Sequence, residues 1–116
     1  MQNTLFGFEK LHVYQVAMTA LEKTIEHKRC WAGLPGELAP QLQTAMQSIV
    51  NNIVEGAGRW TQKDQKHFYR IARASTYESA GCVYSAIKHK AVEKEIADEI
   101  LELLSRVGRM LTVMCR

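Results

Sequence analysis

Residues 93–116, EKEIADEILELLSRVGRMLTVMCR, decide the fold class of this chain. Their apolar side chains recur at steps of three and four, which places them on one face of an α-helix. Acidic residues dominate the first half of the stretch and arginines the second, an order that complements the helix dipole. The stretch therefore predicts an amphipathic helix. Its apolar positions are Ile96, Ile100, Leu103, Leu104, Val107, Leu111 and Met114.

Two further helices are predicted in the first half of the chain. Residues 8–31 carry apolar residues at helical spacing, and a break that contains glycine and proline follows them. The next helix begins near residues 35–37, so that Pro40 falls in its first turn, where the missing N–H breaks no internal hydrogen bond. This helix stops at Gly56 and Gly58. The first half of the chain thus predicts two helices joined by a short turn.

A long third helix is predicted before the final one. Thr61 followed by Asp64 resembles a capping box, and it opens this helix at about Gln62. Small residues dominate the predicted buried face, so neighbouring helices can approach it closely and it should lie centrally. A short turn at residues 90–92 leads to the last helix. The predicted buried face consists of Phe68, Ile71, Ala72, Ser75, Ser79, Cys82, Val83 and Ala86.

The four predicted helices fit a single domain. A chain of 116 residues has the usual size of one domain, and short connections make successive helices antiparallel neighbours. The chain has only two prolines, and its strand-favouring residues do not alternate with polar ones. We therefore predict an all-α fold, in which residues 1–116 form one up-and-down antiparallel four-helix bundle.

The composition also restricts where the protein works. Residues 1–7 lack the basic and apolar regions of a secretory signal. Polar residues interrupt every apolar stretch before it reaches the ~18 residues that a membrane span needs. Three widely spaced cysteines, Cys30, Cys82 and Cys115, fit reduced thiols that serve as small packing residues. We expect a cytoplasmic protein with no membrane partner.

Catalytic motifs are missing from the sequence. It has no Walker loop, no Gly-x-Ser-x-Gly elbow and no cysteine paired locally with a histidine. Two pairs, Glu9 with His12 and Asp64 with His67, superficially match part of a di-iron site in a helical bundle. The first pair lies in an opening turn and the second lies among lysines, where a dication is poorly placed. We expect no enzymatic activity, no metal and no cofactor.

One side of the third predicted helix is basic. Five cations occur at steps of four, three, four and three, which places them in a narrow sector that faces away from the predicted core. Cations in such a line can contact phosphates, and tyrosines that continue the line can stack on bases. We therefore expect nucleic acid to bind here, with Tyr77 included in the site. This basic stripe consists of Arg59, Lys63, Lys66, Arg70 and Arg73, and Tyr77, Tyr84 and Lys88 extend it.

Two other interpretations of the basic stripe stay open. Charged runs on helices are usually solvated faces without a partner. The basic stripe also fits an oligomer interface, in which it docks on the acidic first half of residues 93–116 in a neighbouring subunit. The formal net charge of +3 is mild, so the arrangement of charge, and not its amount, argues for nucleic acid.

A second group of residues is interpreted as structural. Its polar members lie beside apolar positions, and a half-buried carboxylate there needs hydrogen-bond donors. An amide, a helix N-terminus or Arg59 could supply those donors. Its two glycines are interpreted as allowing the chain to turn, because a lone Gly-Ala-Gly is too weak a pattern for a phosphate loop. The group consists of Asn52, Glu55, Gly56, Gly58 and Glu78.

Five segments spread over nearly the whole chain match a known pattern. They are FEKLHVYQ (8–15), SIVNNIVEGAGR (48–59), FYRIA (68–72), STYE (75–78) and VGRML (107–111). The pattern resembles the bacterial four-helix-bundle family first described from intervening sequences in large-subunit ribosomal RNA genes. Two positions depart from it, because Val50 stands where the family often has proline and Arg73 where it often has glycine.

This resemblance implies a bundle that assembles as a ring-like homopentamer and associates with RNA, in a family without an established enzymatic activity. A distantly similar group, the accessory proteins of diversity-generating retroelements, binds a reverse transcriptase and nucleic acid. The function we expect is a non-catalytic oligomer that binds RNA or DNA through the basic stripe. The alternative is a structural or adaptor oligomer that binds a protein partner such as a polymerase or reverse transcriptase.

Overall fold

The computed structural model describes residues 4–116, and all regular structure in this range is helical. The all-α prediction is therefore confirmed. Residues 1–3, part of the stretch in which we expect no secretory signal, lie outside the described range. The elements are the 3-10 helix η1 (Gly7–Lys10) and the α-helices α1 (His12–Glu26), α2 (Lys28–Ala32), α3 (Leu38–Ala57), α4 (Gln62–Lys88) and α5 (Lys94–Met114).

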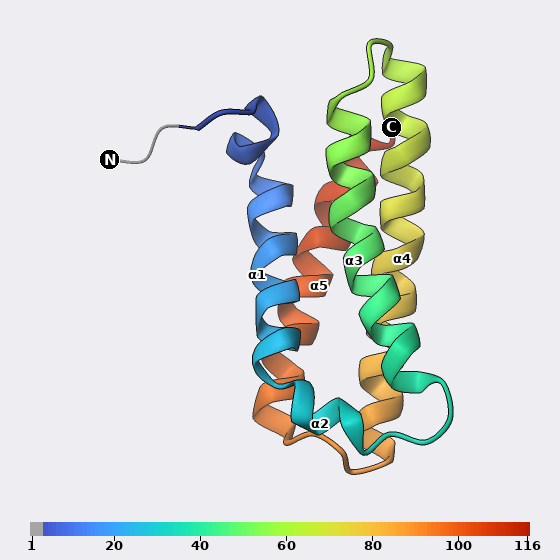
Figure 1. The fold of residues 1–116 in the computed structure, drawn as a ribbon. Coiled ribbons are helices and arrows are strands. Elements are labelled where there is room, and N and C mark those ends of the chain that lie inside the picture. Colours follow the sequence, from blue (N-terminus) through green and yellow to red (C-terminus); the bar gives the residue numbers. More distant parts are fainter. Residues whose placement is uncertain (1–3) are drawn as a thin grey trace.

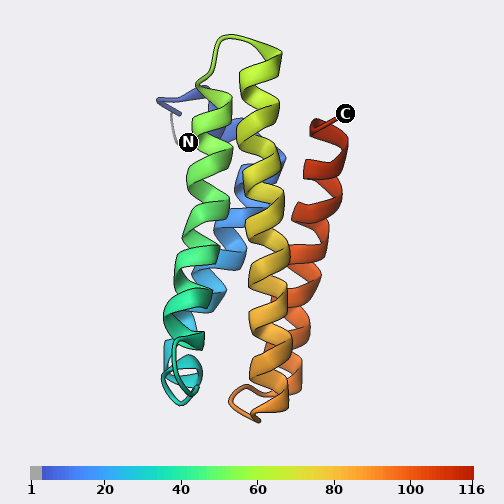
Figure 2. The same cartoon turned by 90° about the vertical axis from the view of Figure 1, so that its right-hand side faces the viewer.

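The four long helices, α1, α3, α4 and α5, run alternately up and down (Figure 1). Helix α4 packs against α3 on one side and against α5 on the other, and a second view shows it between these two neighbours (Figure 2). Helix α1 closes the arrangement by packing on α5 and less extensively on α3. The described chain measures 43 × 34 × 20 Å along its principal axes. Each of the four long helices therefore has two long neighbours, so the prediction that α4 is central is wrong, although α4 and α3 share the most extensive contact.

The final helix forms as the sequence predicts. In α5, Ile100, Val107 and Leu111 are completely buried, and they meet apolar side chains from the other three long helices. Burial of each such side chain stabilises the fold by about 1.5–3 kcal/mol relative to exposure. The opposite face of α5 keeps its charged residues in solvent. Within residues 4–116, no helix is both long enough and apolar enough to cross a membrane.

The single helix predicted for residues 8–31 is wrong, because the structure divides it into η1, α1 and α2. The Glu9 carboxylate accepts hydrogen bonds from the backbone N–H groups of Leu5 and Phe6 and so ties the first turn to itself. Leu11 is then extended and separates η1 from α1. At the other end, the Trp31 indole donates to a carbonyl in the last turns of α1, and the chain bends to bring this ring into the core.

The other boundaries follow the prediction closely. Helix α3 starts at Leu38, slightly later than predicted, and Pro40 lies in its first turn. Helix α4 starts at Gln62, and the Asp64 N–H donates to the Thr61 hydroxyl at 3.1 Å, so the predicted cap is confirmed. The turn before α5 contains Lys90 with a φ of 57°. Short polar turns therefore separate the last three helices where the sequence places them.

The predicted buried face of α4 needs one correction. Ile71 is 38% exposed, whereas Tyr69, which was not in the predicted set, is buried. Phe68 is only half-buried. Tyr69 is buried because its ring packs into the space left by the missing side chain of Gly56 on α3. A glycine on the opposing helix thus decides which aromatic residue of α4 enters the core.

Candidate nucleic-acid interface

The first turns of α4 carry three cations that have no partner within the described chain. Lys63 and Arg70 are exposed and Lys66 is half-buried. Among residues 4–116, no hydrogen bond or ion pair is made by any of these three side chains. Their charges repel one another by a few tenths of a kcal/mol per pair at helical spacing. A negatively charged ligand would relieve this repulsion.

Arg59 does not lie on α4, which corrects the placement of all five cations on one helix. Helix α3 ends at Ala57 with Gly58 as its C-cap, and α4 begins only after Thr61, whose backbone is extended. The Arg59 guanidinium bonds the Glu55 carboxylate at 3.0 Å and lies 4.5 Å from the ring centroid of Phe68. Arg59 therefore braces the connection between the two helices, and its charge is already paired.

Arg73 also has partners inside the protein. Its Nε donates to the Thr112 hydroxyl of α5 at 2.8 Å, and a terminal nitrogen donates to the Tyr77 hydroxyl at 3.0 Å. The guanidinium lies 4.6 Å from the centroid of the Tyr77 ring. Arg73 therefore links α4 to α5, and it is half-buried. The three unpartnered members of the basic stripe are Lys63, Lys66 and Arg70.

Two tyrosines line a shallow groove between α4 and α5. Tyr77 is 61% exposed and Tyr84 is 60% exposed, one on each side of Ala80. The groove has a volume of about 250 Å³, and Arg109 of α5 lines its other wall. The structure thus brings Tyr77 next to Arg73, as the spacing predicts, and adds a cation from α5 that sequence spacing does not reveal.

The residues interpreted as a structural group are separated by the fold. Asn52 donates to the backbone carbonyl and to the hydroxyl of Ser48, at 2.8 and 3.0 Å. Glu55 bonds Arg59, one of the donors we considered, but its carboxylate is exposed and not half-buried. Glu78 is exposed as well. The expectation of half-buried carboxylates is therefore wrong, because both project from the solvent side of their helices.

The prediction that both glycines allow the chain to turn is wrong for Gly56, whereas Gly58 does lie at the turn where α3 stops. Gly56 lies inside α3 and is buried against the Tyr69 ring, so its function is close approach between helices. Gly58 ends α3 with a φ of −85°, a conformation that any residue adopts. A methyl group at Gly58 would meet only ordinary contacts at 3.6 Å or more. The conformational freedom of glycine is not needed at either position.

Charge is distributed unevenly along the long axis of the molecule. The upper half in Figure 1 holds the start of α1, the end of α3, the start of α4 and the end of α5. We call residues 4–18, 48–75 and 104–116 the basic end, because they contain nine basic and three acidic residues, a net charge of +6. Residues 19–47 and 76–103, the acidic end, contain six basic and nine acidic residues, a net charge of −3. The basic stripe belongs entirely to the basic end.

Sequence reasoning missed Trp60, which is 99% exposed. It lies in the connection between α3 and α4, directly after Arg59 and three residues before Lys63. Tryptophan is highly buried on average in folded proteins. A signal was present in the sequence, since Trp60 stands between two predicted helices, outside the apolar pattern of either.

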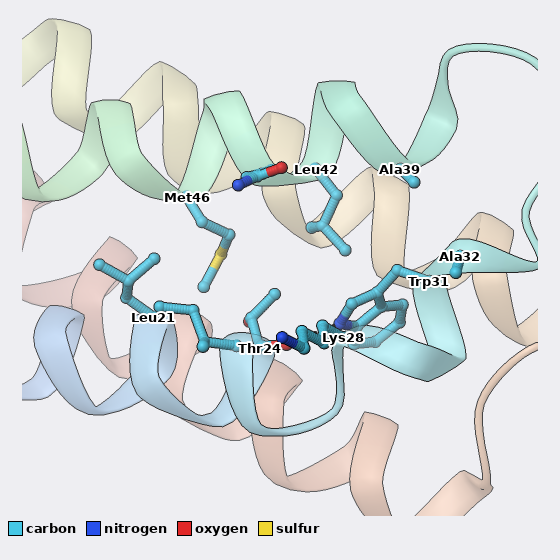
Figure 3. A pocket seen from close by; sticks show the side chains of 10 residues that line it. Leu21, Thr24, Lys28, Trp31, Ala32, Ala39, Leu42 and Met46 are labelled. Atoms are coloured by element: carbon cyan, nitrogen blue, oxygen red, sulfur yellow. Dashed lines mark hydrogen bonds between the residues drawn. The ribbon is translucent and has the colours of Figure 1, made fainter.

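An apolar groove lies at the other end of the molecule, between α1, α2 and the start of α3 (Figure 3). Leu21, Trp31, Leu42 and Met46 point into it, and its volume is about 440 Å³. The Trp31 indole donates to the Thr24 carbonyl at 2.8 Å, which fixes the ring in the wall. Its lining residues include no carboxylate, histidine or cysteine. The amine of Lys28 and the hydroxyl group of Thr24 are therefore not accompanied by a carboxylate or imidazole base among the lining residues.

The two carboxylate–histidine pairs have other roles in the fold. The Glu9 carboxylate is occupied by backbone N–H groups, and His12 faces the Arg106 guanidinium at 3.4 Å. His67 lies edge-on against Phe68, with the ring centroids 5.0 Å apart. Among residues 4–116, no three side chains of histidine, cysteine, aspartate or glutamate lie together in a group that could hold a metal ion.

Comparison with known proteins adds two findings. The family model for the 23S rRNA-intervening sequence protein matches residues 9–113. A crystal structure from Bacteroides thetaiotaomicron, of a protein with unknown function from the S23 ribosomal protein family, superposes with a TM-score of 0.82 at 14% sequence identity. That superposition covers 90% of this chain and 98% of the other, and at this identity it shows a shared fold alone. No curated protein is similar enough to this chain to add a third finding.

Proposed function

Since this chain belongs to the 23S rRNA-intervening sequence protein family, we propose that it is a non-catalytic four-helix-bundle protein that binds RNA through Lys63, Lys66 and Arg70. Arg59, Arg73 and Tyr77 support this surface through their own contacts. Arg59 is paired with Glu55 before the three cations, and Arg73 is bonded to Thr112 and Tyr77 after them. The bound RNA would be held through its phosphates, a mode that depends on the shape and charge of the backbone and little on base identity.

The observation that carries this proposal is the absence of partners, among the described residues, around three adjacent cations at the basic end. A protein can retain such a cluster at little cost to its own stability, since exposed like charges repel only weakly. The same three cations would neutralise up to three phosphates and release their counterions, which favours binding strongly at low salt. The net charge of +6 at this end of the molecule extends the attraction beyond the contact itself.

We also propose that the protein acts as an oligomer, in keeping with the ring-like homopentamer that the family resemblance implies. A ring of identical subunits would repeat the basic end five times around one axis. Several weak phosphate contacts on one RNA would then act together, because each further contact is effectively intramolecular once the first has formed. A single subunit with three free cations would bind RNA only weakly by comparison.

A protein contact is the competing explanation of the basic stripe. The first turns of α5 carry Glu93, Glu95 and Glu102, which have no ion-pair partner among the described residues. A neighbouring subunit could place its basic stripe on these glutamates, and the surface would then join subunits instead of binding RNA. Charge removal would weaken the oligomer in that case.

The deciding experiment compares two variants that lose the same charges from opposite ends. Lys66→Ala/Arg70→Ala removes two cations from the basic stripe. Lys28→Ala/Arg29→Ala removes one lysine and one arginine from α2, where both side chains are exposed. Fluorescence anisotropy with a structured RNA and a duplex DNA is measured at about 50 and about 200 mM salt, the range over which phosphate contacts lose most of their strength. Light scattering gives the oligomeric state of each variant.

We expect the basic-stripe variant to bind RNA several-fold more weakly and with a log–log salt slope shallower by about 1.5, the value for two lost phosphate contacts. The α2 variant should keep most of the affinity and most of the slope. Equal binding by the wild type and the basic-stripe variant would contradict the assignment. A basic-stripe variant that loses its oligomeric state together with its RNA affinity would favour the subunit interface.

A further inference from the structure

We propose that Trp60 stacks on an unpaired base of the bound RNA, so that the protein prefers single-stranded RNA or a loop to a continuous duplex. This inference rests on the proposed function and names the kind of RNA. Its starting point is the 99% exposure of Trp60, against 5% for Trp31, the only other tryptophan in the chain. Leaving a large aromatic ring in water forgoes about 1.5–3 kcal/mol of burial, so a ligand that covers the ring gains that free energy.

The backbone on both sides of Trp60 is fixed. On one side, the Arg59 N–H donates to the Gly56 carbonyl at 3.1 Å, and the Arg59 carbonyl accepts from the Gln65 amide at 3.1 Å. On the other side, the Thr61 hydroxyl accepts from the Asp64 N–H at 3.1 Å. A residue held between two such anchors loses little further freedom when it binds. The backbone that carries the ring is therefore already ordered, and the backbone entropy lost on stacking is small.

The Arg59 side chain adds to this bracing without filling the space around the indole. It is held on the Glu55 carboxylate at 3.0 Å and over the Phe68 ring at 4.5 Å. The bracing therefore draws the guanidinium toward Glu55 and Phe68, and Trp60 remains exposed beside it. A flat ligand can reach the indole without displacing any described side chain.

Three cations follow Trp60 in the chain. Lys63 lies three residues after it, in the first turn of α4, and Lys66 and Arg70 follow at helical spacing along one side of that helix. Successive bases of a single strand are each joined to a phosphate, so a base on the indole carries its phosphates toward these lysines. This combination of an aromatic ring and a basic track is how proteins hold single strands.

The same neighbours argue against an apolar protein partner for Trp60. An apolar pocket that covered the indole would also bring the ammonium of Lys63 toward low-dielectric surroundings, and desolvating an unpaired charge is unfavourable. A duplex is a poor match as well, because its bases are already stacked on one another. An unpaired nucleotide supplies both a flat face and a negative charge.

The test uses two variants and two RNAs. Trp60→Ala removes the aromatic ring, and Trp60→Phe keeps a smaller one. Both leave the core unchanged, because residue 60 is almost fully exposed. The probes are a 12-nucleotide polyuridine strand and a 12-base-pair RNA duplex, two lengths near the site sizes of single-strand-binding modules. Affinity is measured by anisotropy, and tryptophan fluorescence is measured during the titration. In Trp60→Phe, Trp31 is the only tryptophan that remains, so this variant gives the fluorescence of the buried ring by itself.

The expected result is a roughly 5- to 100-fold loss of affinity for the single strand in Trp60→Ala, the range for one base–aromatic stack. Trp60→Phe should lose less, and duplex binding should change less than about twofold. Single-stranded RNA should quench the fluorescence of the wild type but not that of Trp60→Phe.

Unchanged single-strand affinity in Trp60→Ala would overturn this inference while leaving Lys66 and Arg70 as RNA contacts. An equal loss on both RNAs would overturn it too, because stacking acts on unpaired bases. A change of oligomeric state in Trp60→Ala would assign the ring to a subunit contact instead. Failure of the wild type to bind any RNA would overturn the proposed function itself.

Discussion

Gly56 of α3 lies directly against the ring of Tyr69 of α4. A methyl group at Gly56 would come within 2.6 Å of the Tyr69 Cε1 carbon and within 3.1 Å of the Gln65 carbonyl oxygen. Only a hydrogen atom fits between these two helices, so the glycine fixes how closely they approach. The pair also explains the burial of Tyr69, which the apolar spacing of α4 does not predict.

Gly56→Ala should destabilise the protein by about 1–3 kcal/mol, the usual effect of forcing an extra carbon into a packed core. Gly81 provides the control, since it lies exposed on α4 and a methyl group there would meet nothing within 4 Å. Gly81→Ala should stabilise by about 0.5–1 kcal/mol, because alanine is the better helix former. Urea denaturation of both variants measures the two effects. A neutral Gly56→Ala variant would show that Tyr69 moves aside without loss.

Ser48 and Ser75 join α3 to α4 through their hydroxyl groups, which are 2.8 Å apart. Asn52 also donates to the Ser48 hydroxyl, at 3.0 Å. We expect Ser75→Ala to cost about 1 kcal/mol, because it removes a hydrogen bond between two helices in a mostly buried site. Ser48→Ala should cost clearly less in the Ser75→Ala background than alone. A double-mutant cycle measures this coupling, and strict additivity of the two substitutions would rule it out.

Arg73 should behave differently from Arg70, although both belong to the basic stripe. Arg73→Ala removes one hydrogen bond that joins α4 to Thr112 of α5 and one to Tyr77 within α4, so we expect a loss of about 1–2 kcal/mol in the free energy of unfolding. Arg70→Ala removes no internal contact and should stay within about 0.5 kcal/mol of the wild type. RNA affinity, in contrast, should fall more in Arg70→Ala than in Arg73→Ala. Thermal unfolding measures the stability of the two single variants, and anisotropy measures their RNA affinity. Equal stability and equal affinity in the two variants would contradict the prediction.

Alkaline pH should destabilise the fold through two buried acids. Burial raises the pKa of Tyr69 above its ordinary value of 10.0. Burial, with a smaller effect from the Glu78 charge, raises the pKa of Cys82 above its ordinary value of 9.0. Above pH 9 the unfolded chain therefore releases protons that the folded chain retains. Stability is complete below the ordinary pKa values and falls as the pH rises past them.

Urea midpoints from about pH 8 to about pH 11 measure this loss of stability. Cys82→Ala should remove the part that begins near pH 9, and Tyr69→Phe the part that begins near pH 10. The exposed pair of Lys23 with Glu99 acts in the same direction, because the nearby carboxylates raise the pKa of Lys23 above 10.5. Measurement at about 0.5 M salt screens that pair. A midpoint that does not change up to about pH 11 would contradict the prediction.

The sequence predicts the helices well where periodicity and caps agree. In α5 the apolar positions recur without interruption, and at the start of α4 the pair Thr61 and Asp64 marks the first turn. It fails for residues 8–31, because the breaks there depend on hydrogen bonds between side chains and backbone groups, which apolar spacing does not encode. The Glu9 carboxylate turns back to Leu5 and Phe6, and nothing in the apolar spacing of the segment announces this.

The candidate site could be predicted only in part for a similar reason. Spacing correctly places Lys63, Lys66 and Arg70 along one side of α4. It offers Arg59 as one of several donors for Glu55 but does not select it, and so it does not show that the charge of Arg59 is already paired. Nor can it show that Arg73 reaches across to α5, a contact between residues 39 positions apart. Tertiary partners, which periodicity does not encode, decide which cations remain available.

The separation of a +6 end from a −3 end over a molecule 43 Å long gives the monomer a permanent electric dipole moment along its helices. The electric field of a polyanion exerts a torque on this dipole before contact. The torque turns the basic end, which contains the first turns of α4, toward the polyanion. More of its collisions are then correctly oriented, which raises the association rate. Salt limits the distance over which this advantage acts, because the Debye length, about 8 Å at physiological salt, is much shorter than the molecule. Orientation is therefore a short-range effect in the cell and a long-range one in dilute buffer.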